Sequence, residues 1–267
     1  MEKVEERLSI TVENQGQKIF GVLHLPLNCD KSAPVVLICH GLAGHKAGKH
    51  RVYVDLAYRL ARRGIASFRF DYRGCGDSEG EFHEVTPNSH YSDSEVCLDY
   101  LSNHPSIDSE RIGVFGRSFG GPVAVRAATM TKSVRSVALW CPMYSGEQWL
   151  DQWQLVQSGA VDESITKEMM QVDSQQGSFE FFNQFFGINV SSDLKKLQSI
   201  PLLHIHGEID SRVDLSHAKG YETCRGDAQG KSKFIKLPNT DHDFSNIDER
   251  VNALEETTNW FSETLLV

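Results

Sequence analysis

Apolar residues along this chain fall into short continuous runs that alternate with segments of helical spacing. Val35–Ile38 is a continuous apolar run, which is typical of a strand buried on both faces of a sheet. A further strand is expected at Val134–Trp140. After the first run, Tyr53, Leu56 and Leu60 recur at three- and four-residue steps, as in an amphipathic helix. This alternation of strand and helix predicts an α/β fold with a mostly parallel, doubly wound sheet.

The two ends of the chain complete this pattern. Residues 6–12 and 18–25 are extended runs around a short polar turn, which predicts an antiparallel hairpin. Leu254, Phe261 and Leu265 belong to an apolar stripe that predicts a closing helix. Further strands are expected at 65–70, 112–115, 202–206 and 234–237, and further helices around 96–101, up to about 130, and at 215–224.

Residues 146–199 interrupt the alternation, because they separate two sheet strands by far more than an ordinary α/β connection. Trp149 and Trp153 are four residues apart, and five phenylalanines lie between Phe179 and Phe186. A helix that is aromatic around so much of its circumference must be covered or must cover something. Residues 146–199 are either a small helical insert packed on the core or a lid over the active site. Their position directly after a strand favours the lid.

We therefore expect one domain over residues 1–267, with a core of 1–145 and 200–267 and a cap of 146–199.

Composition narrows the class of protein. Hydrophobic residues make up 40% of the 267 residues and charged residues 24%, as in a globular protein with a large core. The net charge of −9 argues against nucleic acid or an anionic membrane surface as a partner. The six cysteines are scattered without a C-x-x-C pair, so we expect reduced thiols and a cytoplasmic protein. The sequence leaves a homodimer open.

One five-residue motif carries candidate chemistry. Gly116-Arg117-Ser118-Phe119-Gly120 follows an apolar run and fits G-x-S-x-G, a strained strand-to-helix turn that exposes a serine hydroxyl. Only residues without a Cβ let strand and helix approach so closely around such a turn. Ser118 is therefore the candidate nucleophile.

A serine hydroxyl needs a base to remove its proton and a third group to orient that base. Asp210 and His242 each follow a predicted strand directly and come after Ser118 in the order serine, acid, histidine. Asp214 is a rival acid, but we expect it in the following helix. The aspartates on either side of His242 are poor candidates, since loop neighbours rarely reach the adjacent ring.

The developing oxyanion requires two backbone N–H donors, one after the nucleophile and one from an early strand-end loop. Phe119 and Leu42 occupy these places. His204 and His206 share one face of their strand, but no cysteine or carboxylate completes a metal site at a sensible spacing. We expect neither a metal nor a cofactor.

With these residues in place, the sequence resembles α/β-hydrolases from about residue 18 to the C-terminus. The His40-Gly41-Leu42 loop and the cap length are most similar to cinnamoyl (feruloyl) esterases and related acyl esterases, although Arg117 and Phe119 stand where those enzymes commonly have His and Gln. The resemblance implies that the cap contacts the acyl group, and we expect Trp149 or Trp153 to meet the substrate.

The expected function is hydrolysis of small to medium apolar or aromatic carboxylic esters through an acyl-enzyme. The alternatives are thioester, amide or peptide hydrolysis on the same residues, or a binding protein that retains the fold without catalysis.

Overall fold

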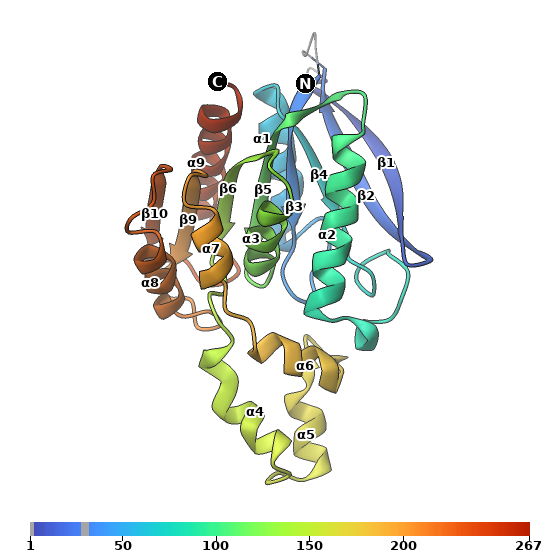
Figure 1. The fold of residues 1–267 in the computed structure, drawn as a ribbon, viewed down its shortest axis with the longest axis vertical. Helices are drawn as coiled ribbons and strands as arrows, with labels where there is room; N and C mark the ends of the chain where they lie inside the picture. The colour runs from blue at the N-terminus through green and yellow to red at the C-terminus, as the bar shows by residue number, and fades with distance from the viewer. Residues whose placement is uncertain (1–2, 28–31) are drawn as a thin grey trace.

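The computed structural model describes residues 3–27 and 32–267. Eight strands form one sheet in the order β1-β2-β4-β3-β5-β6-β9-β10 (Figure 1). The strands are β1 (Glu5–Asn14), β2 (Gln17–Pro26), β3 (Ala33–Cys39), β4 (Ala66–Phe70), β5 (Ile107–Arg117), β6 (Val134–Trp140), β9 (Leu202–Gly207) and β10 (Ser232–Leu237). The pairs β1·β2 and β2·β4 are antiparallel and the remaining pairs are parallel, so the predicted fold class is confirmed.

The N-terminal hairpin owes its register to a two-residue turn. Asn14 pairs with Gln17, which leaves Gln15 and Gly16 as the loop, with φ values of 52° and 80°. Positive φ at both positions is the mark of a type I′ turn, whose twist matches that of the flanking strands. A glycine at the second position relieves the strain that any side chain would add there.

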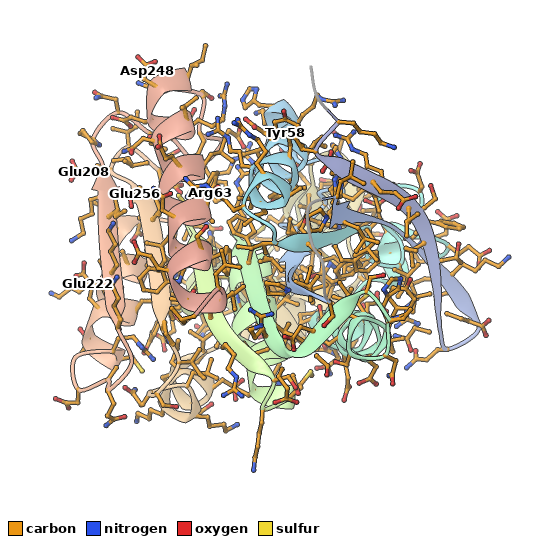
Figure 2. The ribbon with its side chains drawn as sticks, turned by 90° about the horizontal axis from the view of Figure 1, so that it is seen from above. Tyr58, Arg63, Glu208, Glu222, Asp248 and Glu256 are labelled. Carbon is orange, nitrogen blue, oxygen red and sulfur yellow. The ribbon has the colours of Figure 1, made fainter. Side chains whose placement is uncertain are left out.

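Helices cover both faces of the sheet. The main ones are α1 (Val52–Arg62), α2 (Pro87–Ser102), α3 (Gly120–Met130), α8 (Leu215–Cys224) and α9 (Ile247–Leu265). Figure 2 shows α1 and α9 side by side on one face, where Arg63 donates a hydrogen bond of 3.1 Å to Asn259. Apolar residues of α2, α3 and α8 pack into a separate core on the other face. No described helix has an apolar stretch long enough to cross a membrane.

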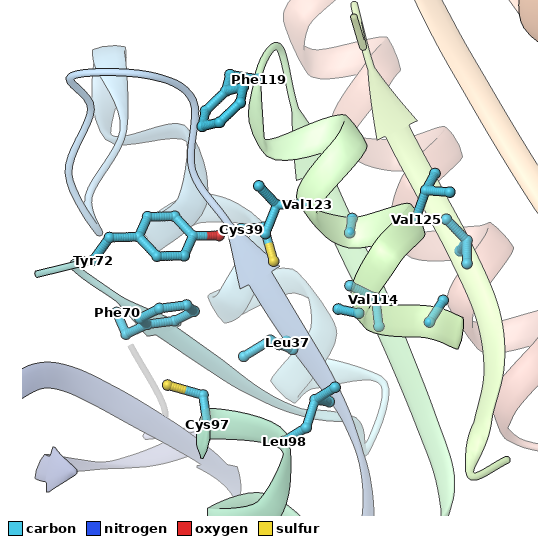
Figure 3. Close-up of a cluster of buried hydrophobic side chains, with 14 of the residues drawn as sticks. Leu37, Cys39, Phe70, Tyr72, Cys97, Leu98, Val114, Phe119, Val123 and Val125 are labelled. Atoms are coloured by element: carbon cyan, nitrogen blue, oxygen red, sulfur yellow. The ribbon is translucent and has the colours of Figure 1, made fainter. Parts of the chain in front are cut away.

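The core beneath α2 and α3 reaches up to the serine turn. Figure 3 shows the rings of Phe70 and Tyr72, which meet edge to face, above Cys97, with Phe119 at the upper end of the same cluster. Burial raises the pKa of the Cys39 thiol to about 11, so this cysteine is a packing residue rather than a nucleophile. The five described cysteines are free; Cys29 lies outside the described residues.

The insertion of residues 146–199 contains α4 (Leu150–Gln157), α5 (Glu163–Met169), β7 (Gln171–Val172), β8 (Gln175–Gln176), α6 (Phe179–Phe186) and α7 (Ser191–Lys196). In Figure 1, α4, α5 and α6 extend beyond the carboxyl ends of the strands, whereas α7 lies beside α3.

The two ends of the part of the insertion that contains α4, α5 and α6 are hydrogen-bonded to each other. Gly146 N–H donates to Ile188 O over 2.9 Å, and Val190 N–H donates to Tyr144 O over 3.0 Å. A Cβ at Gly146 would lie 2.5 Å from Phe186 Cα, so glycine is what allows these two backbone segments to meet. This part of the insertion therefore joins the rest of the chain through two paired backbone segments.

The closing helix gives a direct test of the sheet packing. Phe261 on α9 is fully buried, whereas Val251 on the same helix is 40% exposed. Phe261→Ala should lower the free energy of unfolding by about 3–5 kcal/mol, because it leaves a cavity against the sheet. Val251→Ala should cost less than about 0.5 kcal/mol. Urea unfolding of both variants measures this, and equal losses would contradict the packing of α9.

Candidate active site

Ser118 lies in a strained turn between β5 and α3. Its φ of 56° places a residue with a side chain in the left-handed region, where strain persists only if the surroundings impose it. Three backbone bonds do so: Ser118 N–H donates to Trp140 O over 2.9 Å, and Ser118 O accepts from Gly121 N–H over 2.9 Å and from Met143 N–H over 3.2 Å. The turn is therefore fixed by β6 and by the start of α3.

The two glycines of the motif are required by close backbone contacts. A Cβ at Gly116 would lie 2.2 Å from Gly120 O, and one at Gly120 would lie 2.3 Å from Cys39 O. Both contacts are with backbone atoms, which cannot rotate away as a side chain can. Glycine therefore allows β3, β5 and α3 to converge beneath Ser118.

A continuous chain of hydrogen bonds joins the three residues expected from the sequence. Ser118 Oγ lies 2.9 Å from His242 Nε2, and His242 Nδ1 lies 2.7 Å from Asp210 Oδ2. The carboxylate accepts from Nδ1–H, which leaves the Nε2 lone pair to accept from the serine hydroxyl. Asp210 and His242 are both buried. The arrangement is that of a serine prepared to lose its proton to histidine.

Asp210 is held by the loop that carries it. Its second oxygen, Oδ1, accepts 2.9 Å hydrogen bonds from the N–H groups of Arg212 and Val213. Burial tends to raise the pKa of this carboxyl, but the hydrogen bond and charge of His242, with the bond from Val213, outweigh it and lower the pKa. The carboxylate therefore stays ionised and fixed in place.

The rival acids have other partners. Asp214 caps the start of α8, where it accepts from Ser216 N–H over 2.7 Å. Asp241 accepts from Ser245 N–H over 2.9 Å. Asp243 forms ion pairs with three cationic side chains.

Arg117 is a site residue that sequence reasoning did not assign a role. Its buried guanidinium donates to the backbone carbonyl of His242 over 2.5 Å and to Asp243 Oδ1 over 3.1 Å. It thus ties the serine turn to the histidine loop through contacts separate from that of Asp210. A charged residue within the apolar end of β5 was the available signal, since a buried arginine needs acceptors.

The loop after β3 lies directly against the serine. A Cβ at Gly41 would lie 3.2 Å from Ser118 Cβ and 3.7 Å from its Oγ. Burial lowers the pKa of His40 to about 4, so the ring is neutral; Nδ1–H donates to Gly41 O over 2.7 Å and Nε2 accepts from Tyr72 N–H over 3.3 Å. The imidazole therefore holds this loop in shape.

Leu42 and Phe119 line the same cavity as Ser118. Among the described residues, we find no acceptor for the backbone N–H of either one. Two uncommitted donors beside a serine hydroxyl can stabilise an anion that develops on its reaction partner.

The cavity above Ser118 has a volume of about 770 Å³. Phe119, Met143, Trp149 and Phe185 give it an apolar wall. The Trp149 ring lies 5.5 Å from the Phe185 ring and 5.6 Å from the ring of His217. These contacts hold Trp149 against α6 within the insertion and against α8 outside it.

The structure separates the two tryptophans of the insertion. Trp149 lines the cavity, but Trp153 does not. The Trp153 side chain is 3% exposed and its ring lies 4.7–5.6 Å from the rings of Phe179, Phe182 and Phe186. The expectation of substrate contact is therefore kept for Trp149 and corrected for Trp153, which packs inside the insertion.

A cluster of possible metal ligands lies behind Asp210. Cys141, His206 and Asp210 bring ligand atoms within 4.8 Å of one another. His206 Nε2–H donates to Val213 O over 2.8 Å, so its Nδ1 accepts from His204 over 3.0 Å. Both nitrogens of His206 have partners, and Asp210 binds His242. The cluster is a hydrogen-bonded support for the acid and fits a metal poorly.

Comparison with known proteins identifies the family of the chain. The family model for serine aminopeptidase, S33, matches residues 30–176, which is more than half of the chain. The chain belongs to this family. The family and the fold place it in the α/β-hydrolase superfamily.

Among curated proteins, esterase FrsA of Yersinia pestis is 33% identical over 131 residues, covering 49% of this chain and 30% of FrsA. Thiohydrolase aneE of Aspergillus aculeatus is 33% identical over 129 residues, covering 48% of this chain and 39% of that protein. These matches span less than half of each relative's own length.

Among solved structures, Est1E of Butyrivibrio proteoclasticus with bound ferulic acid superposes with a TM-score of 0.75. The two proteins are 21% identical, and the superposition covers 95% of this chain and 96% of Est1E. At this identity the likeness demonstrates the shared fold.

Proposed function

We propose that the protein is a serine hydrolase that cleaves carboxylic esters through an acyl-enzyme. The observation that carries this proposal is the hydrogen-bonded chain from Asp210 through His242 to Ser118, which ends in a cavity beside two uncommitted backbone N–H groups. A strained serine, a base and an oriented acid are the elements that acyl transfer requires.

Each group has one role in the proposed reaction. His242 Nε2 takes the proton of Ser118 as Oγ attacks the ester carbonyl, and the N–H groups of Leu42 and Phe119 stabilise the oxyanion. The imidazolium then protonates the leaving alkoxide, and the acyl group remains on Ser118. Water attacks the acyl-enzyme with His242 again as base, which releases the acid. Asp210 stabilises the charged imidazole and fixes its tautomer throughout.

We propose that residues 146–199 act as a lid that contacts the acyl group. Trp149 and Phe185 support this, because both belong to the insertion and both line the cavity. Aromatic rings bury large areas and stack on flat groups for about 0.5–1.5 kcal/mol per pair. Ferulic acid, the ligand of Est1E, is a flat aromatic acid, and an apolar or aromatic acyl group fits this wall.

Thioester and amide hydrolysis use the same residues. The thiohydrolase relative and the peptidase description of the family favour including both reactions in the assay. Purified protein should be compared on p-nitrophenyl esters, a hydroxycinnamate ester, an acyl thioester and a peptide amide. We expect the highest kcat/KM with an ester; a higher value with the thioester or the amide would replace the ester assignment.

The acid assignment has a matched pair of variants. Asp210→Asn should lower kcat for a p-nitrophenyl ester by about 10⁴, because the amide favours the wrong tautomer of His242. Asp214→Asn should cost less than tenfold, since this residue only caps α8. Steady-state rates and circular dichroism of both variants make the comparison. The assignment is wrong if Asp214→Asn is the more damaging change.

The two tryptophans give a second matched pair. Trp149→Ala should lower the preference for hydroxycinnamoyl over acetyl esters by about tenfold, which corresponds to about 1.4 kcal/mol of lost aromatic contact. Trp153→Ala should lower thermal stability but leave this ratio close to that of wild type. The measurement is kcat/KM for both esters. If neither variant changes the ratio, the insertion does not select the acyl group.

A further inference from the structure

Three cationic side chains surround one carboxylate in the cavity. Lys49 Nζ lies 2.5 Å and Arg212 Nη2 lies 4.0 Å from Asp243 Oδ2, while Arg117 Nη2 lies 3.1 Å from Oδ1. All four residues line the cavity that contains Ser118. The mechanism above gives no role to Lys49 or Arg212.

One carboxylate cannot neutralise three cations. In the described part of the chain, neither Lys49 nor Arg212 has another acidic partner within 4 Å. Asp173 adds a second negative charge to the cavity lining, so the three cations outnumber the carboxylates of the lining by one, while ionised Asp210 lies behind His242. Lys49 and Arg212 thus present exposed positive charge to the cavity in a chain with a net charge of −9, and exposed cations beside a cavity attract an anion.

The two outer cations are accessible to a ligand. The side chains of Lys49 and Arg212 are 54% and 57% exposed, whereas Arg117 is 10% exposed and stays bound to the His242 carbonyl. Lys49 and Arg212 can therefore turn toward a bound group while Arg117 remains in place. The guanidinium of Arg212 also has the planar shape that pairs with two oxygens of a carboxylate or phosphate.

The position of these cations indicates which part of the substrate they would contact, the acyl group or the leaving group. Asp243 directly follows His242, which must approach the leaving oxygen in order to protonate it. The apolar wall of Phe119, Met143, Trp149 and Phe185 is suited to the acyl half. An anionic group bound by Lys49 and Arg212 thus belongs to the leaving alcohol or thiol.

We propose that Lys49 and Arg212 bind a carboxylate or phosphate carried by the leaving group of the substrate. The inference rests on the proposed function and names the substrate class of the same site. Asp243 is the internal counter-ion that holds both cations toward the cavity before the substrate arrives.

The test compares acetyl esters that share the acyl group and differ in the charge of the leaving group: 4-acetoxybenzoate, 4-acetoxyphenyl phosphate and the neutral 4-acetoxybenzamide. Lys49→Gln and Arg212→Gln should each lower the anionic-to-neutral ratio of kcat/KM by about fivefold, as expected for one exposed ion pair. Arg63→Gln, which removes a cation that contacts α9 outside the cavity, should leave the ratio unchanged.

A larger fall for the phosphate ester than for the benzoate would identify phosphate as the preferred anion, and the reverse would identify carboxylate.

Asp243→Asn should change the anionic-to-neutral ratio of kcat/KM in the opposite direction. It removes the competing negative charge and should raise the anionic-to-neutral ratio, whereas structural damage would lower the rates for all three esters together. Higher salt should reduce the ratio in wild type because exposed charges are screened. Ratios that stay constant in Lys49→Gln, Arg212→Gln and Asp243→Asn would overturn the proposal.

A binding measurement separates this inference from the proposed function. Tryptophan fluorescence of Ser118→Ala should report tighter binding of 4-hydroxybenzoate than of 4-hydroxybenzamide, and Arg212→Gln in that background should remove the difference. Preferential anion binding by a protein that hydrolyses no ester would support the anion site and reject the ester function. Equal binding of both compounds would reject the anion site whatever the activity.

Discussion

The close approach of three backbone segments beneath Ser118 is the constraint on which the site depends. Without glycine at 116 and 120, a Cβ would lie 2.2 Å or 2.3 Å from a neighbouring carbonyl oxygen, and β3, β5 and α3 could not converge. Their convergence holds Ser118 at a positive φ. Because β9 and β10 run parallel to β5 in the same sheet, the loops that carry Asp210 and His242 emerge at the same edge and meet the serine there.

The histidine loop is then fixed from two sides. Asp210 binds the imidazole, while Arg117 binds the His242 carbonyl and the Asp243 carboxylate. Burial tends to raise the pKa of Asp243, but Lys49, Arg117 and Arg212 overcome it and lower the pKa to about 2. The ion cluster therefore persists across the neutral range. The same ion cluster thus fixes the position of the histidine loop and supplies the cations of the cavity, where we propose that an anionic leaving group binds.

The sequence predicts what depends on local pattern or chain order. Continuous apolar runs identified the central strands, and the order of serine, acid and histidine after strands identified three residues that the fold brings together. Lys49 and Asp243 are 194 residues apart, and no local pattern links them. Equal helical spacing suggested one face for Trp149 and Trp153, but a 3₁₀ turn ends at Trp149 and α4 starts at Leu150, so the two rings diverge. Only the packing of the insertion distinguishes them.

The central claim is that Ser118 is the nucleophile of an acyl-enzyme. Intact-mass spectrometry after treatment with a fluorophosphonate tests it most directly, because this reagent phosphonylates an activated serine. We expect one adduct per chain, located on Ser118 by peptide mapping, and none in a folded Ser118→Ala variant. An adduct that persists in Ser118→Ala, or an unmodified wild-type protein, would contradict the account.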